Sequence, residues 1–239
     1  MDFKNVYEDS KRADAYSKLE FPGTYYLAYR DIPELIYEHY KNGKALDFGC
    51  GTGRSTRFLK KLGFDSVGID ISYEMICKAK YLDPDGKYTL IKNDDFSELG
   101  EGKFDLILAA FTFDNIPGKE RRVQLLRKLN SLLHPKSIML LLDSTPELYL
   151  NDWSSFITTV FKENKKAVSG QIVKTIMKDV DDGRPVEDVL WIDEDYRECF
   201  NKSGFSLIRT HKPLGREEEP FNWINETKIA PWVIYVIKK

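Results

Sequence analysis

The sequence contains few cysteines: Cys50, Cys77 and Cys199 are the only three, and none forms a C-x-x-C pair. A set this sparse excludes a disulfide framework and a zinc site, so we expect no metal and a reduced, cytoplasmic protein. Long apolar runs are also lacking, because none approaches the ~20 residues of a membrane-spanning helix. The charged N-terminal stretch has no targeting pattern, so a membrane partner is not expected.

An excess of basic residues is lacking as well. The chain has 36 Lys and Arg against 38 Asp and Glu, a net charge of −2 and a pI near 6.0. Nucleic-acid binders usually carry a basic excess, so nucleic acid is a disfavoured partner. The one modest basic group, on a predicted helix, is interpreted as a solvated face and comprises Arg121, Arg122, Arg127 and Lys128.

What is present is a glycine-rich stretch, KALDFGCGTG at residues 44–53. Its apolar alternation predicts a short strand, and the residues after Gly53 predict a helix whose free N–H groups face a ligand over the turn. A dinucleotide fingerprint would place its third glycine at position 54, where this chain has Arg54. The spacing therefore argues against a nicotinamide-dependent oxidoreductase.

The pattern downstream predicts an α/β fold. Strands ending at Asp70, Ile91, Ala110 and Leu142 alternate with helical segments, which is typical of a doubly wound, mostly parallel sheet. Asp70 comes about 20 residues after the glycine turn, where the ribose-binding acid of a βαβ nucleotide site belongs. Two C-terminal strands without a crossover helix predict an antiparallel last strand.

These elements fit one domain of 239 residues, long enough for a full core and an insertion. We expect an N-terminal helical flap at 1–43, a ligand-binding core at 44–143, a lid insertion at 144–193, and a C-terminal helix with an antiparallel strand pair at 194–239. The oligomeric state is not predicted. The insertion contains a predicted hairpin around Asp182-Gly183, preceded by an aromatic-rich piece expected to be helical.

The D-x-G-x-G-x-G stretch beginning at Asp47, together with Asp70 and the NDDF segment at residues 93–96, resembles the class I S-adenosylmethionine (SAM)-dependent methyltransferases. That resemblance implies a seven-stranded sheet, SAM as cofactor and S-adenosylhomocysteine as product. It also implies that the methionine part of SAM contacts Asp47, Gly49 and Gly51, and that Asp70 bonds both ribose hydroxyls.

The resemblance implies further cofactor contacts. The adenine would contact Ile71 and Phe96, with Asp95, or alternatively Asp94, accepting from its exocyclic amine, and the sulfonium would lie beside Ala109 and Phe111. In the N-terminal segment, Arg30 is a candidate clamp for a carboxylate, and Tyr16 or Tyr25 are candidates for lining the pocket. The alternative for this segment is a helix packed on the sheet.

The fourth strand is followed by AAFTFDN instead of the N/D-P-P-Y/F motif found in enzymes that methylate amino groups of nucleic acids or protein glutamine. We therefore expect transfer to an oxygen or nitrogen of a small molecule. Asp114, Asn115 and His211 are weak catalytic candidates; a general base is needed only if the acceptor is protonated. An RNA or protein methyltransferase and a non-catalytic SAM-binding protein are the alternatives.

Overall fold

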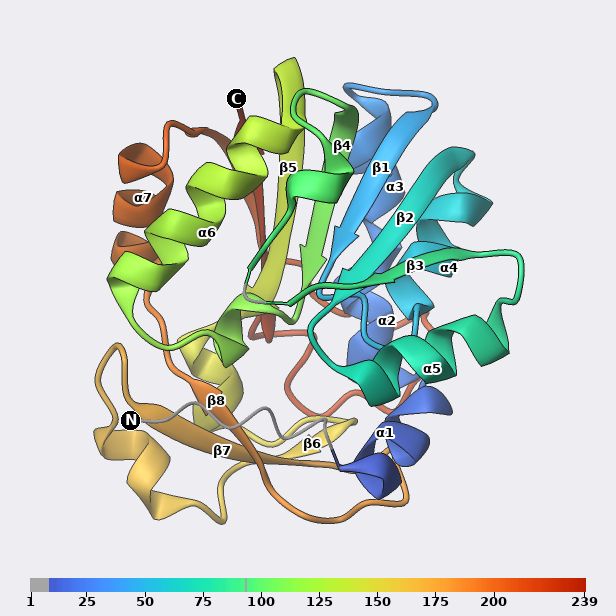
Figure 1. Ribbon diagram of the computed structural model, residues 1–239. Helices are drawn as coiled ribbons and strands as arrows, with labels where there is room; N and C mark the ends of the chain where they lie inside the picture. Colours follow the sequence, from blue (N-terminus) through green and yellow to red (C-terminus); the bar gives the residue numbers. More distant parts are fainter. Residues whose placement is uncertain (1–8, 93) are drawn as a thin grey trace.

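The computed structural model describes residues 9–92 and 94–239, and its centre is a seven-stranded sheet in the order β3-β2-β1-β4-β5-β10-β9 (Figure 1). The strands are β1 (Gly43–Phe48), β2 (Phe64–Asp70), β3 (Lys87–Leu90), β4 (Phe104–Ala110), β5 (Leu133–Ser144), β9 (Ser206–His211) and β10 (Trp232–Lys238). β10 runs antiparallel to both of its neighbours, whereas β1 to β5 pair in parallel. The predicted fold class is confirmed.

Helices cover both faces of the sheet (Figure 1). They are α1 (Ser10–Ser17), α2 (Gly23–Arg30), α3 (Ile32–Tyr37), α4 (Arg54–Lys61), α5 (Tyr73–Leu82), α6 (Lys119–Leu132) and α7 (Asp193–Lys202). Short 3-10 turns are η2 (Ser97–Leu99), η3 (Phe113–Asn115), η4 (Pro146–Leu150) and η5 (Lys162–Lys166). Ser72 is the N-cap of α5, since its Oγ accepts a hydrogen bond from the Met75 N–H at 3.3 Å.

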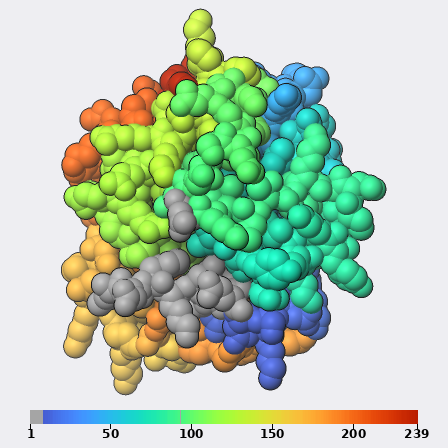
Figure 2. All heavy atoms as spheres, in the orientation of Figure 1, coloured from blue at the N-terminus to red at the C-terminus, as the bar shows by residue number. Residues whose placement is uncertain are grey.

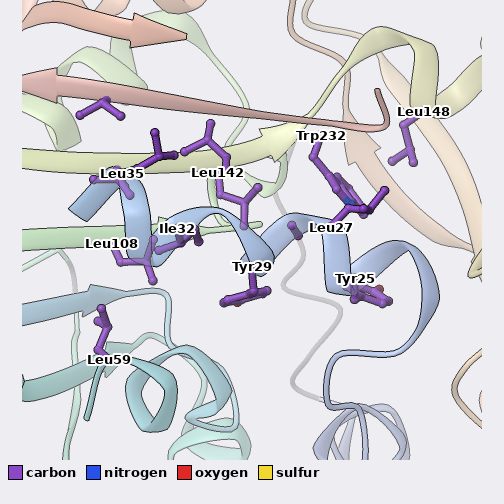
Figure 3. Packing of buried hydrophobic residues seen from close by; sticks show 14 of the residues in the cluster. Tyr25, Leu27, Tyr29, Ile32, Leu35, Leu59, Leu108, Leu142, Leu148 and Trp232 are labelled. Carbon is purple, nitrogen blue, oxygen red and sulfur yellow. The ribbon is translucent and has the colours of Figure 1, made fainter. Parts of the chain in front are cut away.

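Successive side chains of each strand point to opposite faces of the sheet, and this alternation divides the core into two layers. In β4, Leu106 and Leu108 pack with α2, α3 and α4, whereas Ile107 and Ala109 pack with α6 and α7. Figure 3 shows the first layer, where Leu27, Ile32 and Leu35 lie against strand residues such as Leu108 and Leu142. Successive strand side chains point to opposite faces, so a strand buried on both faces reads as a continuous apolar run.

Residues 144–193, called the lid segment below, lie beyond the carboxyl ends of the parallel strands (Figure 1). They form a small antiparallel sheet of β6 (Phe156–Ile157), β7 (Ile172–Met177) and β8 (Val186–Val189). In the space-filling view this segment borders α1 at the same end of the molecule (Figure 2). The predicted hairpin is β7–β8, but the aromatic-rich piece before it forms only the 3-10 turns η4 and η5 and strand β6, because its bulky side chains fill a shared core instead of one helix face.

Glu226, which is fully buried, joins three distant segments. Its Oε1 accepts hydrogen bonds from the Thr24 hydroxyl in α2 and from both the N–H and the hydroxyl of Ser154, each at 2.7 Å. Its Oε2 accepts the N–H groups of Ile224 and Asn225 at 2.8 and 3.0 Å. A buried carboxylate is tolerated when it is this fully hydrogen-bonded, so Glu226 fixes the lid segment against the N-terminal helices.

The described part of the N-terminal segment, residues 9–43, combines both sequence interpretations. α2 and α3 pack on the sheet, as ordinary core helices do. Tyr16, Tyr25 and Tyr29 from the same segment nevertheless line a cavity at the strand ends. Residues 1–8 of the predicted flap lie outside the described residues. No helix in the described ranges is long and apolar enough to span a membrane.

Candidate functional site

The turn after β1 has the tight geometry that its glycines predict. Gly49, Gly51 and Gly53 have φ angles of +73°, +52° and +80°, in the left-handed region that favours glycine. A Cβ added at Gly49 would lie 2.4 Å from the Thr112 hydroxyl oxygen. Only backbone therefore fits between Gly49 and the end of β4, and Gly49 and Gly51 line the adjacent cavity.

Asp70, at the end of β2, is aimed at this turn. Its Oδ2 accepts the Gly51 N–H and its Oδ1 accepts the Ser72 N–H, both at 2.8 Å. Burial raises the pKa of the Asp70 carboxyl, while these two backbone hydrogen bonds lower it. Each carboxylate oxygen has two lone pairs, so each keeps acceptor capacity for a ligand hydroxyl.

Asp47 lies beneath the turn and is not part of the cavity wall. Its Oδ2 accepts hydrogen bonds from the hydroxyls of Ser55 and Thr56 at 2.7 and 2.6 Å, which tie the start of α4 to β1. Its Oδ1 is buried without a partner among the described residues. Burial raises the pKa of Asp47 to about 6. Contact with the methionine part of SAM stays a prediction for this residue, and the observed contacts give it a positioning role.

One cavity joins the glycine turn to the lid segment. Two of its wall residues, Asp94 and Phe111, have φ angles of +53° and +56°, a strained conformation for residues with side chains. The cavity brings together most of the residues selected from the sequence: Tyr16, Tyr25, Gly49, Gly51, Asp70, Ile71, Asp94, Phe96, Phe111, Asp114 and Asn115.

Four other candidates lie outside the cavity wall. Ala109 is in the core between the sheet and α6 and α7. Asp95 is exposed and accepts the Ser97 N–H at 3.0 Å, so Asp94 is the better placed of the two acids. The remaining two, Arg30 and His211, belong to a polar network at the other end of α2.

In that network, Arg30 Nε donates to Asp31 at 2.7 Å and its Nη1 donates to Glu219 at 2.7 Å. His211 Nε2 lies 2.8 Å from the second Asp31 oxygen. Burial raises the pKa of Asp31, but the hydrogen bonds with Arg30 and His211 outweigh this effect and hold it below its usual range. Arg30 thus pairs with carboxylates of this chain, and His211 is engaged away from the cavity.

Arg54 is the cavity residue whose role sequence reasoning missed. It is 4 % exposed, its guanidinium donates to the Glu20 carbonyl at 2.6 Å and to the Tyr16 hydroxyl at 3.1 Å, and no ion pair to it is found within residues 9–92 and 94–239. Four aromatic rings surround it at 5.0–5.6 Å, those of Tyr16, Phe21, Tyr25 and Tyr29. The cavity therefore contains a fixed cation beside the glycine turn.

The opposite end of the cavity is acidic. Asp114 from η3 and Asp188 from β8 both line it and are 5 % and 6 % exposed. Tyr149 donates its hydroxyl to Asp188 at 3.1 Å, and Asn115 donates to Asp114 at 2.6 Å. Burial raises the pKa of Asp188 to about 7 and that of Asp114 well above its ordinary value. Asp188 carried no signal in the sequence, because a single carboxylate in a hairpin strand is usually solvated.

The strand order, with one antiparallel strand next to the edge and the glycine turn and acid at adjacent strand ends, is that of the class I methyltransferase fold. Residues 46–139 match the family model described as "Methyltransferase domain". The resemblance to the class I SAM-dependent methyltransferases is thereby confirmed for the core of the chain.

Individual relatives agree with this assignment. A putative methyltransferase of Bacillus subtilis, YqeM, is 27 % identical over 103 residues, which is 42 % of this chain and 42 % of that protein. The match thus spans less than half the length of this relative. A SAM-dependent methyltransferase from Mesorhizobium loti has the same fold, with a TM-score of 0.63 and 16 % identity over 89 % of this chain and 98 % of that one.

Another similar structure is the 1,6-didemethyltoxoflavin-N1-methyltransferase of Burkholderia thailandensis with bound 1,6-didemethyltoxoflavin and S-adenosylhomocysteine. Its TM-score is 0.55 at 13 % identity, over 89 % of this chain and 78 % of that one. Identities this low establish a shared fold only.

Proposed function

We propose that this protein transfers the methyl group of SAM to an oxygen or nitrogen of a small-molecule acceptor. The observation that carries the proposal is the continuity of the cavity, whose wall includes Gly51 and Asp70 at one end and Thr175 and Asp188 of the lid segment at the other. A methyl donor and an acceptor must meet in one enclosed space. The methyltransferase family match and the SAM-dependent enzymes of the same fold support the cofactor assignment.

The residues present fit the parts of SAM. Asp70 offers two carboxylate oxygens for the ribose hydroxyls, and Ile71 and Phe96 offer apolar surface for the adenine. Arg54 offers the methionine carboxylate a buried guanidinium that has no ion pair with the described residues. Bound SAM supplies a methyl group already activated by a sulfonium charge, so the protein has mainly to orient the acceptor and exclude water.

The walls between the two ends are aromatic. Tyr25, Phe111, Phe156 and Trp232 contact one another with ring centroids 4.8 to 6.0 Å apart. Three of these side chains come from outside the core segment, which explains why an N-terminal helix, the lid segment and β10 are all needed to build the site. An apolar wall with a few polar groups suits a small organic acceptor.

An RNA or protein acceptor is less well supported. Arg122, one of the basic group on α6, is fully buried rather than on a solvated face, which corrects that part of the sequence interpretation. Arg121 pairs with Asp94 at 3.2 Å, and Arg127 donates to the Lys202 carbonyl at 2.9 Å. These contacts leave α6 without a basic stripe of free side chains for a polyanion.

Isothermal titration with SAM, S-adenosylhomocysteine and NAD tests the cofactor assignment. We expect micromolar binding of the first two and none of NAD. Mass spectrometry for S-adenosylhomocysteine release over a panel of small acceptors then tests catalysis. SAM binding with zero turnover over a broad panel supports the non-catalytic alternative, and NAD binding alone contradicts the whole assignment.

A further inference from the structure

The acidic end of the cavity contains more carboxyl groups than the protein neutralises. Asp143, at the end of β5, lies beside Asp114 and is completely buried. Arg122 Nη2 lies 3.9 Å from its Oδ2, and the Tyr196 hydroxyl donates to it. Asp114 and Asp188 line the cavity itself, and no Lys or Arg of the described chain forms an ion pair with either. Three carboxyls therefore share one guanidinium.

Thr175 supplies a second, independent observation. This β7 residue lines the same cavity and is 4 % exposed, and its Oγ1 has no hydrogen-bond partner among the described residues. A buried hydroxyl without a partner costs about 1–3 kcal/mol, so natural proteins rarely retain one unless something occupies the site. Thr175 pairs in register with Val186, two residues before Asp188 in β8, which places the hydroxyl close to the acidic groups.

The protonation states favour a cationic occupant. Burial raises the pKa of Asp143, although Arg122 and Tyr196 oppose this effect, and burial together with neighbouring carboxylates raises the pKa values of Asp114 and Asp188. A positive charge in the cavity would oppose both causes and stabilise the ionised forms. A negatively charged acceptor would instead face uncompensated repulsion.

We infer that the acceptor is an amine, bound in its protonated form with the ammonium group against Asp114, Asp188 and Thr175. This inference rests on the proposed methyltransferase function and names its substrate class. An ammonium has three N–H donors, and these three side chains provide three acceptors. The aromatic walls formed by Phe111 and Trp232 suit the rest of a cationic ligand.

The same three side chains also provide a group that can accept the proton which the ammonium must lose before methyl transfer. An ammonium nitrogen has no lone pair, so it must lose a proton before it attacks a methyl group. Asp188 accepts that proton, the nitrogen lone pair forms the new N–C bond, and the C–S bond breaks with its electron pair on sulfur. The products are S-adenosylhomocysteine and the methylated ammonium, and Asp188 later releases its proton to solvent.

The test begins with calorimetric titration of S-adenosylhomocysteine into the 239-residue protein. Failure to bind contradicts the proposed function itself. Thermal unfolding of the S-adenosylhomocysteine complex is then followed during titration with three probes of matched shape: benzylamine, benzyl alcohol and benzoate. We expect benzylamine to bind at least about tenfold more tightly than benzyl alcohol, the range for a hydrogen bond to a charged group, and benzoate not to bind.

Two variants test whether Asp188 and Thr175 cause the preference for benzylamine. Asp188→Asn should weaken benzylamine binding about tenfold and leave benzyl alcohol binding unchanged. Thr175→Val should weaken benzylamine binding while the ligand-free protein unfolds at the same or a higher temperature, because an unpartnered hydroxyl is removed. Asp181→Asn is the matched control, since the Asp181 side chain of the lid segment is 83 % exposed. This variant should bind all three probes as the wild type does.

If benzyl alcohol or benzoate stabilises the complex as well as benzylamine does, or if Asp188→Asn leaves every probe unchanged while S-adenosylhomocysteine still binds, the amine assignment is wrong and the cofactor assignment stands.

Discussion

Arg122 on α6 lies 3.9 Å from Asp143 at the end of β5, and both side chains are fully buried. The Arg122 guanidinium also donates to the Tyr196 hydroxyl at 3.0 Å and lies over the Trp191 ring at 4.1 Å. α6, β5 and α7 are thus connected through one buried cation next to the acidic end of the cavity.

Replacing Arg122 tests this connection. Arg122→Met keeps most of the packing but leaves the Asp143 carboxylate buried without its cation, so the free energy of unfolding should fall by about 3–5 kcal/mol. Urea unfolding measures the change, with the exposed Arg127→Met on the same helix as the control, expected below about 1 kcal/mol. Adding Asp143→Asn should recover part of the loss. An equal loss in the free energy of unfolding for Arg122→Met and Arg127→Met would mean that the Arg122–Asp143 pair does not stabilise the protein.

Asp70 should contribute to binding of the whole adenosine part. Asp70→Ala should weaken binding of S-adenosylhomocysteine by about 1.5–3 kcal/mol, because hydrogen bonds to a charged group are lost. Titration calorimetry measures this change. Asp65→Ala is a matched control on the same strand, where the carboxylate is half exposed and pairs with Lys87. Wild-type affinity in the Asp70 variant would contradict the ribose assignment.

Arg54 should increase the binding affinity only of ligands that carry a carboxylate. Arg54→Met should weaken binding of S-adenosylhomocysteine at least about tenfold, but leave 5′-methylthioadenosine, which lacks the amino acid part, nearly unchanged. Arg57→Met, on the same helix but outside the cavity wall, serves as the control. A similar loss for both ligands would show that Arg54 acts by packing against its aromatic neighbours.

Asp188 should impose a pH dependence on stability. Its pKa is about 7 in the folded protein and near 4 in an unfolded chain, so the folded state binds more protons between these values. The Asp188 contribution to the free energy of unfolding therefore falls as the pH rises from about 4 to about 7. Asp114, Asp143, Arg122 and Tyr149 are the groups that face this site.

Thermal unfolding from pH 5 to 8 measures this dependence. Asp188→Asn should flatten the decline and unfold at a higher temperature than the wild type at pH 8, whereas Asp181→Asn should follow the wild-type profile. Parallel profiles for wild type and Asp188→Asn would show that Asp188 titrates at its ordinary pKa in the folded protein.

Much of the core was predictable because its signals are local. A few neighbouring residues are enough to predict each of three features: the continuous apolar run of β4, the glycine turn after β1, and Asp70 at the end of β2. The parallel strands then bring their carboxyl ends to one edge, which is why Asp70, Asp94 and Phe111 meet in one cavity.

The roles of the other site residues depended on tertiary structure. Arg54 differs from an ordinary first-turn helix residue only because α1 and α2 surround it with aromatic rings. Arg122 follows the pattern of a solvated basic face until α7, more than 60 residues later, covers it. Asp188 becomes an unusual acid because β8 packs against η3.

The sequence alone thus determined the sheet, the glycine turn and the position of Asp70 beside that turn, since periodicity and turn chemistry are set by near neighbours. The tertiary structure decided which charges are buried and which of them lie together at the acidic end of the cavity, because burial and electrostatic neighbours come from segments far apart in the chain.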